Sequence, residues 1–123
     1  MTVELSSFQC IEMAVFDMTT LNGSYQVLNG AAQQPTTSSV GFQYDIKILK
    51  IYNDGDTGIQ ISYDGVVPHD YLPSKGTMII DLQANHADNS AYGSGTKNGR
   101  QGQLLYGLGS AATSGNLYIS GYR

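Results

Sequence analysis

Cysteine, charge and long apolar runs are all scarce in this chain of 123 residues. Cys10 is the only cysteine, so no internal disulfide can form and a cysteine-based zinc site is excluded. No apolar stretch reaches the roughly 18 residues that a membrane-spanning helix needs. The N-terminal residues also lack the basic region and apolar core of a signal peptide. We therefore expect no membrane partner.

Charged residues make up only 13% of the chain, and the formal net charge is −4. The six basic residues are scattered, whereas phosphate binding needs clustered Lys and Arg, so we expect no nucleic-acid partner. What the chain has instead is 15 Gly, 9 Tyr and many small polar residues. Tyrosine and phenylalanine favour strands, and this composition is typical of all-β proteins and of surfaces that bind by shape.

Residues 40–64 carry the clearest strand signal. Leu49 and Ile51 have the opposite parity to the apolar residues before them, so the strand is either apolar on both faces or contains a bulge. Turn-forming residues fill 53–58, and Ile59, Ile61 and Tyr63 then alternate again. Two alternating runs around a Gly-containing loop predict a β-hairpin. The alternating residues of the first run are Val40, Phe42, Tyr44, Ile46 and Ile48.

Shorter strands are predicted on either side of this segment. Met78, Ile80 and Leu82 alternate with Asp81, which predicts a strand with those three side chains inward. Two nearby prolines rule out a central strand between residues 68 and 73. Polar stretches at 31–39 and 83–102 are expected to be loops. Further strands are predicted at 25–27, at 103–108, and at 116–122, where Leu117 and Ile119 share one face.

The pattern as a whole predicts an all-β fold. Six to eight short strands with frequent turn signals are typical of an antiparallel β-sandwich or a jelly-roll-like barrel. Residues 1–20 have both helical and alternating spacing, and we interpret them as an N-terminal arm or short strand. Residues 21–123 are then expected to form a single β-sandwich domain.

No constellation predicts an enzyme or a cofactor. The turn at 53–56 has oxygen ligands for Ca²⁺, but Asn and Asp are also preferred turn formers and the order of an EF-hand is absent. The two histidines, His69 and His86, have neighbouring carboxylates but no third ligand at a fixed spacing, so solvated loop histidines are the favoured interpretation. No serine lies in a nucleophile elbow. We expect no catalytic residue, no cofactor and no metal.

Exposed aromatic and apolar side chains are candidates for a partner interface. Aromatic residues are enriched at interfaces, although they are also ordinary cross-strand neighbours. The segment from Asp64 to Tyr71 is either a binding loop or a tight connection between sheets. The candidate interface residues are Phe8, Ile11 and Val15 of the arm, together with Tyr106, Tyr118 and Tyr122.

A set of turn motifs runs through residues 46–85. They are a strand ending in Asn, a strand ending in Ser-x-Asp-Gly, a His-Asp loop, a Pro-Ser-x-Gly turn and a strand ending in Asp. Together with LNGSYQVL at 21–28 and LYISGYR at 117–123, the set resembles small structural proteins of tailed bacteriophages. The residues that carry it are Asn53, Ser62-Tyr63-Asp64-Gly65, His69-Asp70, Pro73-Ser74-Lys75-Gly76 and Asp81.

The resemblance implies a non-enzymatic virion component with a β-sandwich or jelly-roll fold. A capsid decoration (cement) protein, which binds and stabilises the assembled head, is the member of that class we expect. Its partner would be the major capsid protein or another virion protein, and it would assemble as a homo-oligomer. The resemblance also implies synthesis in the cytoplasm of the bacterial host and a place on the outer surface of the capsid.

Other readings stay open at this point. One is a tail or head–tail joining component, and a related one is a carbohydrate- or receptor-binding module of a tail, suggested by loops rich in Tyr, Asn and Gly. A small hydrolase using His69 or His86 is the last reading, and no nucleophile supports it.

Overall fold

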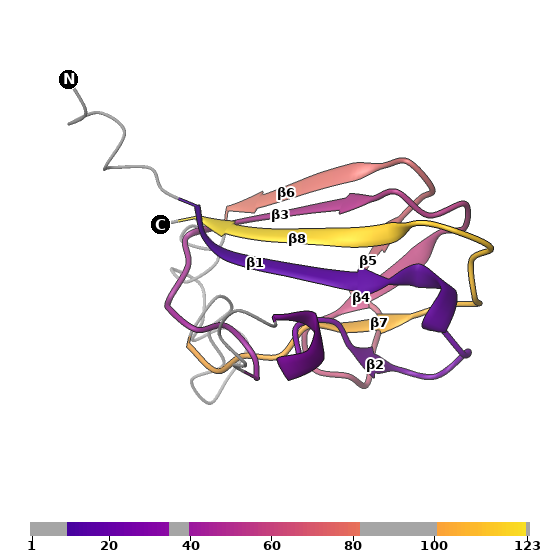
Figure 1. Ribbon diagram of the computed structural model, residues 1–123. Coiled ribbons are helices and arrows are strands. Elements are labelled where there is room, and N and C mark those ends of the chain that lie inside the picture. Colours follow the sequence, from indigo (N-terminus) through magenta and orange to yellow (C-terminus); the bar gives the residue numbers. More distant parts are fainter. Residues whose placement is uncertain (1–9, 35–39, 82–100, 123) are drawn as a thin grey trace, which may run out of the picture.

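The chain folds into two antiparallel four-stranded sheets that face each other (Figure 1). The computed structural model describes residues 10–34, 40–81 and 101–122. Sheet A contains, in spatial order, β1 (Cys10–Asp17), β8 (Asn116–Tyr122), β3 (Ile48–Asn53) and β6 (Thr77–Asp81). Sheet B contains β2 (Gln26–Val27), β7 (Tyr106–Leu108), β4 (Ile59–Ser62) and β5 (Asp70–Leu72). The 3₁₀ turns η1 (Met18–Thr20) and η2 (Ala31–Gln33) follow β1 and β2. The predicted all-β sandwich is confirmed.

Strand pairing follows a simple rule. The first strand pairs with the last, the second with the second-last, and so on inward. The pairs are β1 with β8, β2 with β7, β3 with β6 and β4 with β5. Two further pairings, β3 with β8 and β4 with β7, complete the sheets. The beginning of β1 and the end of β8 therefore lie side by side, with Cys10 opposite Tyr122.

The core lies between the two sheets and is built from alternate residues of the strands. Leu49 and Ile51 of β3 and Leu117 and Ile119 of β8 are at most 1% exposed. Ile59 and Ile61 of β4 are buried opposite them in sheet B. Because successive side chains of a strand point to opposite faces, one set of apolar residues per strand is enough to line this core. The pattern also determines which residues point outward.

The predicted hairpin across residues 40–64 is wrong. Its two strands, β3 and β4, belong to different sheets and do not pair. The turn between them crosses from sheet A to sheet B, so both strands turn their apolar faces to the same core. Periodicity reports only that one face of each strand is buried, and a crossing between sheets satisfies it as well as a hairpin does.

The predicted strand at 40–48 is also wrong for most of its length, because β3 begins only at Ile48. Val40 and Tyr44 are 62% and 42% exposed, while Phe42 and Ile46 are buried. The backbone of this segment bonds elsewhere: the Phe42 N–H donates to the Gln103 carbonyl, and the Gly102 N–H donates to the Phe42 carbonyl. These bonds hold Phe42 against the residues before β7. Lys47, at the end of the segment, donates its N–H to the Tyr122 carbonyl of β8 in sheet A.

Other predicted elements agree with the structure. In β6, Met78 and Ile80 pack on the core and Asp81 is exposed, as predicted. In β8, Leu117 and Ile119 share the inward face. The segment between the two prolines contributes only the edge strand β5. The predicted strands at 25–27 and 103–108 are shortened to β2 and β7.

Several predictions fall on residues outside the description. The first nine residues of the expected arm, Leu82, and most of the loops at 31–39 and 83–102 belong to this group. Residues 10–17 form β1, which pairs with β8 along the edge of sheet A. Within the described ranges, no helix is long and apolar enough to cross a membrane.

Candidate interaction surface

The outward side chains of sheet A form a broad, largely apolar surface. They are the residues that alternate with the buried ones along each strand, so they point away from the sandwich. Together we call them the sheet A outer face. The middle of the face consists of Met13 and Val15 of β1, Tyr118, Ser120 and Tyr122 of β8, Ile48, Lys50 and Tyr52 of β3, and Thr77 and Ile79 of β6. Asp17, Asn116 and Asp81 have the same parity and lie at the ends of the face.

Apolar side chains on this face are well exposed. The exposed fraction is 68% for Ile79, 56% for Met13, 40% for Val15 and 36% for Tyr118. A single exposed apolar residue is ordinary on a soluble protein, whereas neighbouring ones mark interaction surfaces. Met13, Val15 and Tyr118 lie on the adjacent strands β1 and β8, and Ile79 lies on the opposite edge strand β6. This face is therefore a candidate interaction surface.

The register of the strands arranges the middle of this face in two rows. Each row contains one residue from every strand, in the order β1, β8, β3, β6. The first row consists of Val15, Tyr118, Tyr52 and Thr77. The second row consists of Met13, Ser120, Lys50 and Ile79. Only Lys50 is charged among these residues, although the chain as a whole has a net charge of −4.

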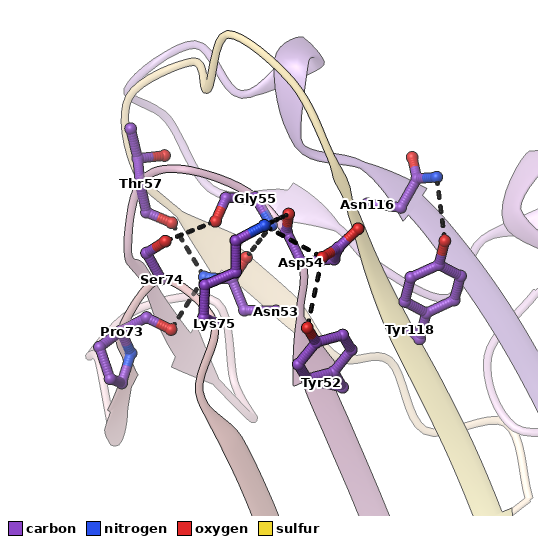
Figure 2. A network of polar contacts seen from close by, with 10 residues as sticks. All are labelled: Tyr52, Asn53, Asp54, Gly55, Thr57, Pro73, Ser74, Lys75, Asn116 and Tyr118. Atoms are coloured by element: carbon purple, nitrogen blue, oxygen red, sulfur yellow. Dashed lines mark hydrogen bonds and ion pairs between the residues drawn. The ribbon is translucent and has the colours of Figure 1, made fainter.

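Two tyrosines form the centre of the first row. The rings of Tyr52 and Tyr118 are stacked, with centroids 6.2 Å apart and an interplanar angle of 15°. The Tyr52 hydroxyl donates to Asp54 Oδ1 over 3.3 Å, and Asn116 Nδ2 donates to the Tyr118 hydroxyl over 3.5 Å (Figure 2). Tyrosine supplies a large contact area with few rotatable bonds, so a ring pair held at its polar tips is well suited to binding.

An ion pair keeps the acceptor of Tyr52 charged. Lys75 Nζ lies 3.1 Å from Asp54 Oδ1 and also donates to the Asp54 carbonyl over 2.9 Å. The hydrogen bond from Lys75, followed by its positive charge, lowers the pKa of the Asp54 carboxyl below its ordinary value. Asp54 therefore stays ionised at neutral pH and continues to accept from the tyrosine.

Asn53 anchors the same turn from within the protein. Its side chain is fully buried, its Nδ2 donates to the carbonyls of Thr57 and Pro73 over 2.9 and 3.2 Å, and its Oδ1 accepts from the Gly55 N–H over 2.8 Å. Ser74 Oγ donates to the Gly55 carbonyl over 2.6 Å. Since Pro73 follows β5 of sheet B, these bonds connect the end of β3 to the opposite sheet (Figure 2).

The oxygens of the acidic turn at 53–56 are engaged in this scaffold. Asp56 accepts from the Thr113 hydroxyl and, over 2.9 Å, from the Thr113 N–H. The hydrogen bond from the hydroxyl, followed by that from the N–H, lowers the pKa of the Asp56 carboxyl. Among the residues that the structure describes, no three His, Cys, Asp or Glu side chains group as metal ligands would. Hydrogen bonding to main-chain and side-chain donors therefore accounts for the Asn and Asp residues of this turn.

A second exposed apolar feature is the β4–β5 loop, residues 63–69, which we call the Val66 loop. Val66 and Val67 at its tip are 74% and 51% exposed. Asp64 Oδ1 accepts from the N–H groups of both valines over 2.9 and 3.1 Å. Ser62 Oγ accepts from the Gly65 N–H over 2.9 Å and donates to the Val67 carbonyl over 2.7 Å. The loop is thus preorganised, and little conformational entropy remains to be lost on binding.

His69 closes the base of this loop. Its Nδ1 accepts from the Tyr63 N–H over 3.1 Å, its Nε2 lies 4.0 Å from Asp64 Oδ2, and its ring packs against Tyr63. Burial, and then the nearby charge of Asp70, raises the pKa of the Tyr63 hydroxyl well above its ordinary value. His69 therefore has a structural role in the loop, while His86 lies outside the described residues. The loop joins two strands of one sheet, so it is not a connection between sheets.

The structure brings together some of the candidate interface residues. Val15, Tyr118 and Tyr122 lie on the sheet A outer face. Tyr106 lies on the outward side of sheet B, where its ring packs against Gly65 of the Val66 loop. Ile11 belongs to β1, and Phe8 lies outside the described residues.

Sequence reasoning missed the other members of the surface, which are Met13, Ile48, Lys50, Tyr52, Thr77, Ile79 and Ser120. The signal for Tyr52 was present, because β3 is apolar on both parities, as a strand covered on both faces would be. Ile79 could be found from the predicted strand at 77–82, where it stands between the inward Met78 and Ile80.

The motifs that resemble phage structural proteins have structural roles in this fold. Asn53, Ser62 and Ser74 hold turns, and Gly65 and Lys75 have positive φ angles of 75° and 62°. No family model, no curated protein and no solved structure matches the chain.

Proposed function

We propose that the protein is a non-enzymatic virion component of a tailed bacteriophage, a capsid decoration protein that binds the outer surface of the assembled head and stabilises it. The observation that carries this proposal is the presence of two exposed apolar features, the sheet A outer face and the Val66 loop, on a chain of low charge. Such surfaces are suited to binding protein rather than nucleic acid. The turn motifs of residues 46–85 and their resemblance to phage structural proteins supply the particular setting.

We also propose that the sandwich is a jelly roll. Wrapping one long antiparallel hairpin around a barrel pairs the first strand with the last, the second with the seventh, and so on inward. The observed pairings β1·β8, β2·β7, β3·β6 and β4·β5 support this topology. Jelly rolls are the fold of many viral capsid and lectin domains, so the topology suits a virion protein.

The sheet A outer face and the Val66 loop have different roles in this proposal. The sheet A outer face makes contacts between virion-protein chains, and the Val66 loop contacts the shell. Each contact alone is modest, but an oligomer that presents several copies of the loop binds a repetitive shell with increased avidity. Val66 and Val67 are the residues expected to touch the major capsid protein.

Cosedimentation with heads that lack the chain tests the function. We expect saturable binding at regular positions, visible as added density on the outer surface. Replacing Val66→Asp and Val67→Asp together is expected to weaken that binding at least about tenfold, because both side chains are exposed and a charge there is costly only when it is covered. Absence of the chain from purified particles would exclude a virion role, and its recovery in tails would support a tail or head–tail joining component instead.

A carbohydrate- or receptor-binding module is the second candidate. Tyr71 and Tyr44 are 63% and 42% exposed, and jelly rolls also occur in lectins. A glycan array supports this candidate if the chain binds a defined sugar and Tyr71→Ala abolishes binding. A blank array together with a location on the head would remove it.

A further inference from the structure

Sheet A has apolar side chains on its outward face, which a sheet open to solvent on that side does not need. Its two central strands, β8 and β3, have apolar side chains on both faces. In β8, Leu117 and Ile119 point inward, while Tyr118 and Tyr122 point outward on either side of Ser120. In β3, Leu49 and Ile51 point inward, while Ile48 and Tyr52 point outward on either side of Lys50. Sheets with one solvated face alternate apolar and polar residues, whereas strands covered on both sides do not. The outer face therefore has more apolar side chains than a solvated face needs, and Ser120 and Lys50 are the polar residues at its centre.

We propose that a second copy of this chain covers the sheet A outer face, in a two-fold dimer with the two sheets A packed face to face. This rests on the proposed function, for which it identifies the contact between copies. The dimer is a property of the isolated chain and is measured without any particle.

The size of the face fits a weak specific dimer. With strands about 4.8 Å apart and about 3.4 Å per residue, the four strands and the length of β8 span roughly 19 by 24 Å. Two such faces bury on the order of 900 Å² before the relief of the side chains adds to it, close to the roughly 1,000 Å² expected of a specific interface. A face of this size suits one partner of the same size.

The charges of the middle rows permit a second copy. Two chains of net charge −4 repel each other, yet the two middle rows contain no carboxylate. Asp17 and Asp81 lie at the ends of strands β1 and β6. Two copies can therefore meet through their middle rows without placing carboxylates against each other.

The two rows are complementary when one copy is turned over. Consider a two-fold axis that is parallel to the sheets, perpendicular to the strands and midway between the two rows. This axis places each strand over the same strand of the second copy, and each row over the other row. Lys50 then lies over Tyr52 of the second copy, where an ammonium group is attracted by the ring face. Ile79 lies over Thr77, Met13 over Val15 and Ser120 over Tyr118 of the second copy, to within the roughly 30° by which twisted sheets cross.

Sedimentation velocity of the full chain, in reducing buffer because Cys10 is exposed, tests the dimer. We expect a monomer–dimer equilibrium with a Kd on the order of 10 μM. A monomer at 200 μM, roughly twenty times that Kd, or a closed trimer would overturn the proposal, because face-to-face packing closes at two copies.

Substitutions at Ile79 locate the interface. Ile79 is 68% exposed on the edge strand β6, so Ile79→Lys leaves the core untouched, and folding is checked by circular dichroism. We expect Ile79→Lys to raise the dimer Kd at least about tenfold. Val40→Glu, at a residue 62% exposed in the segment before β3, serves as the matched control and should leave the Kd unchanged.

A compensating pair tests the orientation. Adding Thr77→Glu to Ile79→Lys places opposite charges over each other across the two-fold axis, so the double variant should recover most of the lost affinity. Failure to recover, or equal weakening by Val40→Glu, would overturn the proposed packing. Because no particle is present, a failure of the dimer is distinct from a failure of head binding in the cosedimentation experiment.

Discussion

At the scale of single residues, the buried polar side chains hold the turns. Asn29, Gln34, Asn53 and Ser62 are each at most 2% exposed. Asn29 Oδ1 accepts from the Leu105 N–H over 2.9 Å, and Gln34 Nε2 donates to the carbonyls of Asn29 and Gly41 over 3.0 and 2.8 Å. A buried polar group is tolerated only when it is paired, and here the partners are main-chain groups of the turns.

Replacing Asn53→Ala should lower the free energy of unfolding by about 2–4 kcal/mol, because it leaves the Gly55 N–H and the carbonyls of Thr57 and Pro73 without their partner. Urea unfolding followed by circular dichroism measures the change.

The same substitution at an exposed position is the control. Asn22 is exposed, and its Oδ1 accepts from the Ser24 N–H over 3.0 Å. Asn22→Ala should cost less than about 1 kcal/mol, because water replaces the lost partner. Equal losses for Asn22→Ala and Asn53→Ala would mean that burial does not set the strength of these bonds.

Stability should fall in acid. Hydrogen bonds lower the pKa of the carboxyls of Asp17, Asp54, Asp56 and Asp64 below the ordinary value of 3.8. Groups with a lowered pKa in the folded state stabilise it above the unfolded value, and that contribution is lost as the pH falls through the folded values. The urea midpoint should therefore change little between about pH 7 and 5 on this account and fall below about pH 4.

Asp64→Asn separates one contribution from the others. Backbone hydrogen bonds from Val66 and Val67 are the main cause of the lowered pKa of Asp64, and an asparagine oxygen can still accept them without titrating. The stability difference between Asp64→Asn and the original chain should be largest at neutral pH and shrink toward pH 3. A difference independent of pH would show that the charge of Asp64 contributes nothing.

At the scale of elements, turns pack directly on one another. Gly115 has a φ of +103°, and a Cβ there would overlap the Asp54 carbonyl oxygen and lie 2.6 Å from Gly55 Cα. The turn before β8 thus packs against the turn after β3. The Met18 N–H donates to the Gly115 carbonyl, and the Asp54 N–H donates to the Asn116 carbonyl.

Gly115→Ala should therefore lower the free energy of unfolding by about 3 kcal/mol or more. Gly23→Ala is the matched control, since Gly23 has a similar φ of +83° but nothing within 4 Å of an added Cβ. It should cost only about 1 kcal/mol, from the unfavourable backbone conformation. Thermal and urea unfolding of both variants measure the difference, and equal costs would contradict the close packing of the two turns.

The elements differ in how far they could be predicted. Strands β6 and β8 were found because each has a clean alternation of inward and outward residues. The segment 40–47 alternates equally well, but Phe42 within it bonds to residues 102 and 103, more than fifty positions away in the chain. Alternation in the sequence shows which side chains share a face. It does not show which distant segment the backbone hydrogen-bonds to, because contacts between residues far apart in the chain decide that.

At the scale of the whole molecule, the pairing of β1 with β8 joins the two ends of the described chain. In sheet A, β8 lies between β1 and β3, so the sheet cannot be completed until this last strand has formed. Such non-local pairing makes folding slow, so we expect a refolding time of milliseconds to seconds, at about 1–1,000 per second. Stopped-flow fluorescence of the tyrosines measures it, and complete folding within microseconds would contradict the topology.

The candidate surface could be predicted only in part. Tyr118 and Tyr122 were identified because they alternate with the inward Leu117 and Ile119 on one short segment. Their neighbours Met13, Lys50 and Ile79 come from three other strands, and only the register places them side by side. Tyr106, the third tyrosine among the candidate interface residues, lies on sheet B.

The sequence by itself determined the class of fold. Its alternation, its turn residues and the lack of a long apolar or charged segment leave an all-β sandwich, because those features act through local geometry and composition. Only the tertiary structure decided that β3 and β4 lie in different sheets and that Asn53 joins those sheets. It also decided which apolar side chains meet on the outer face of sheet A. These depend on which strand pairs with which, and contacts between residues far apart in the chain decide that.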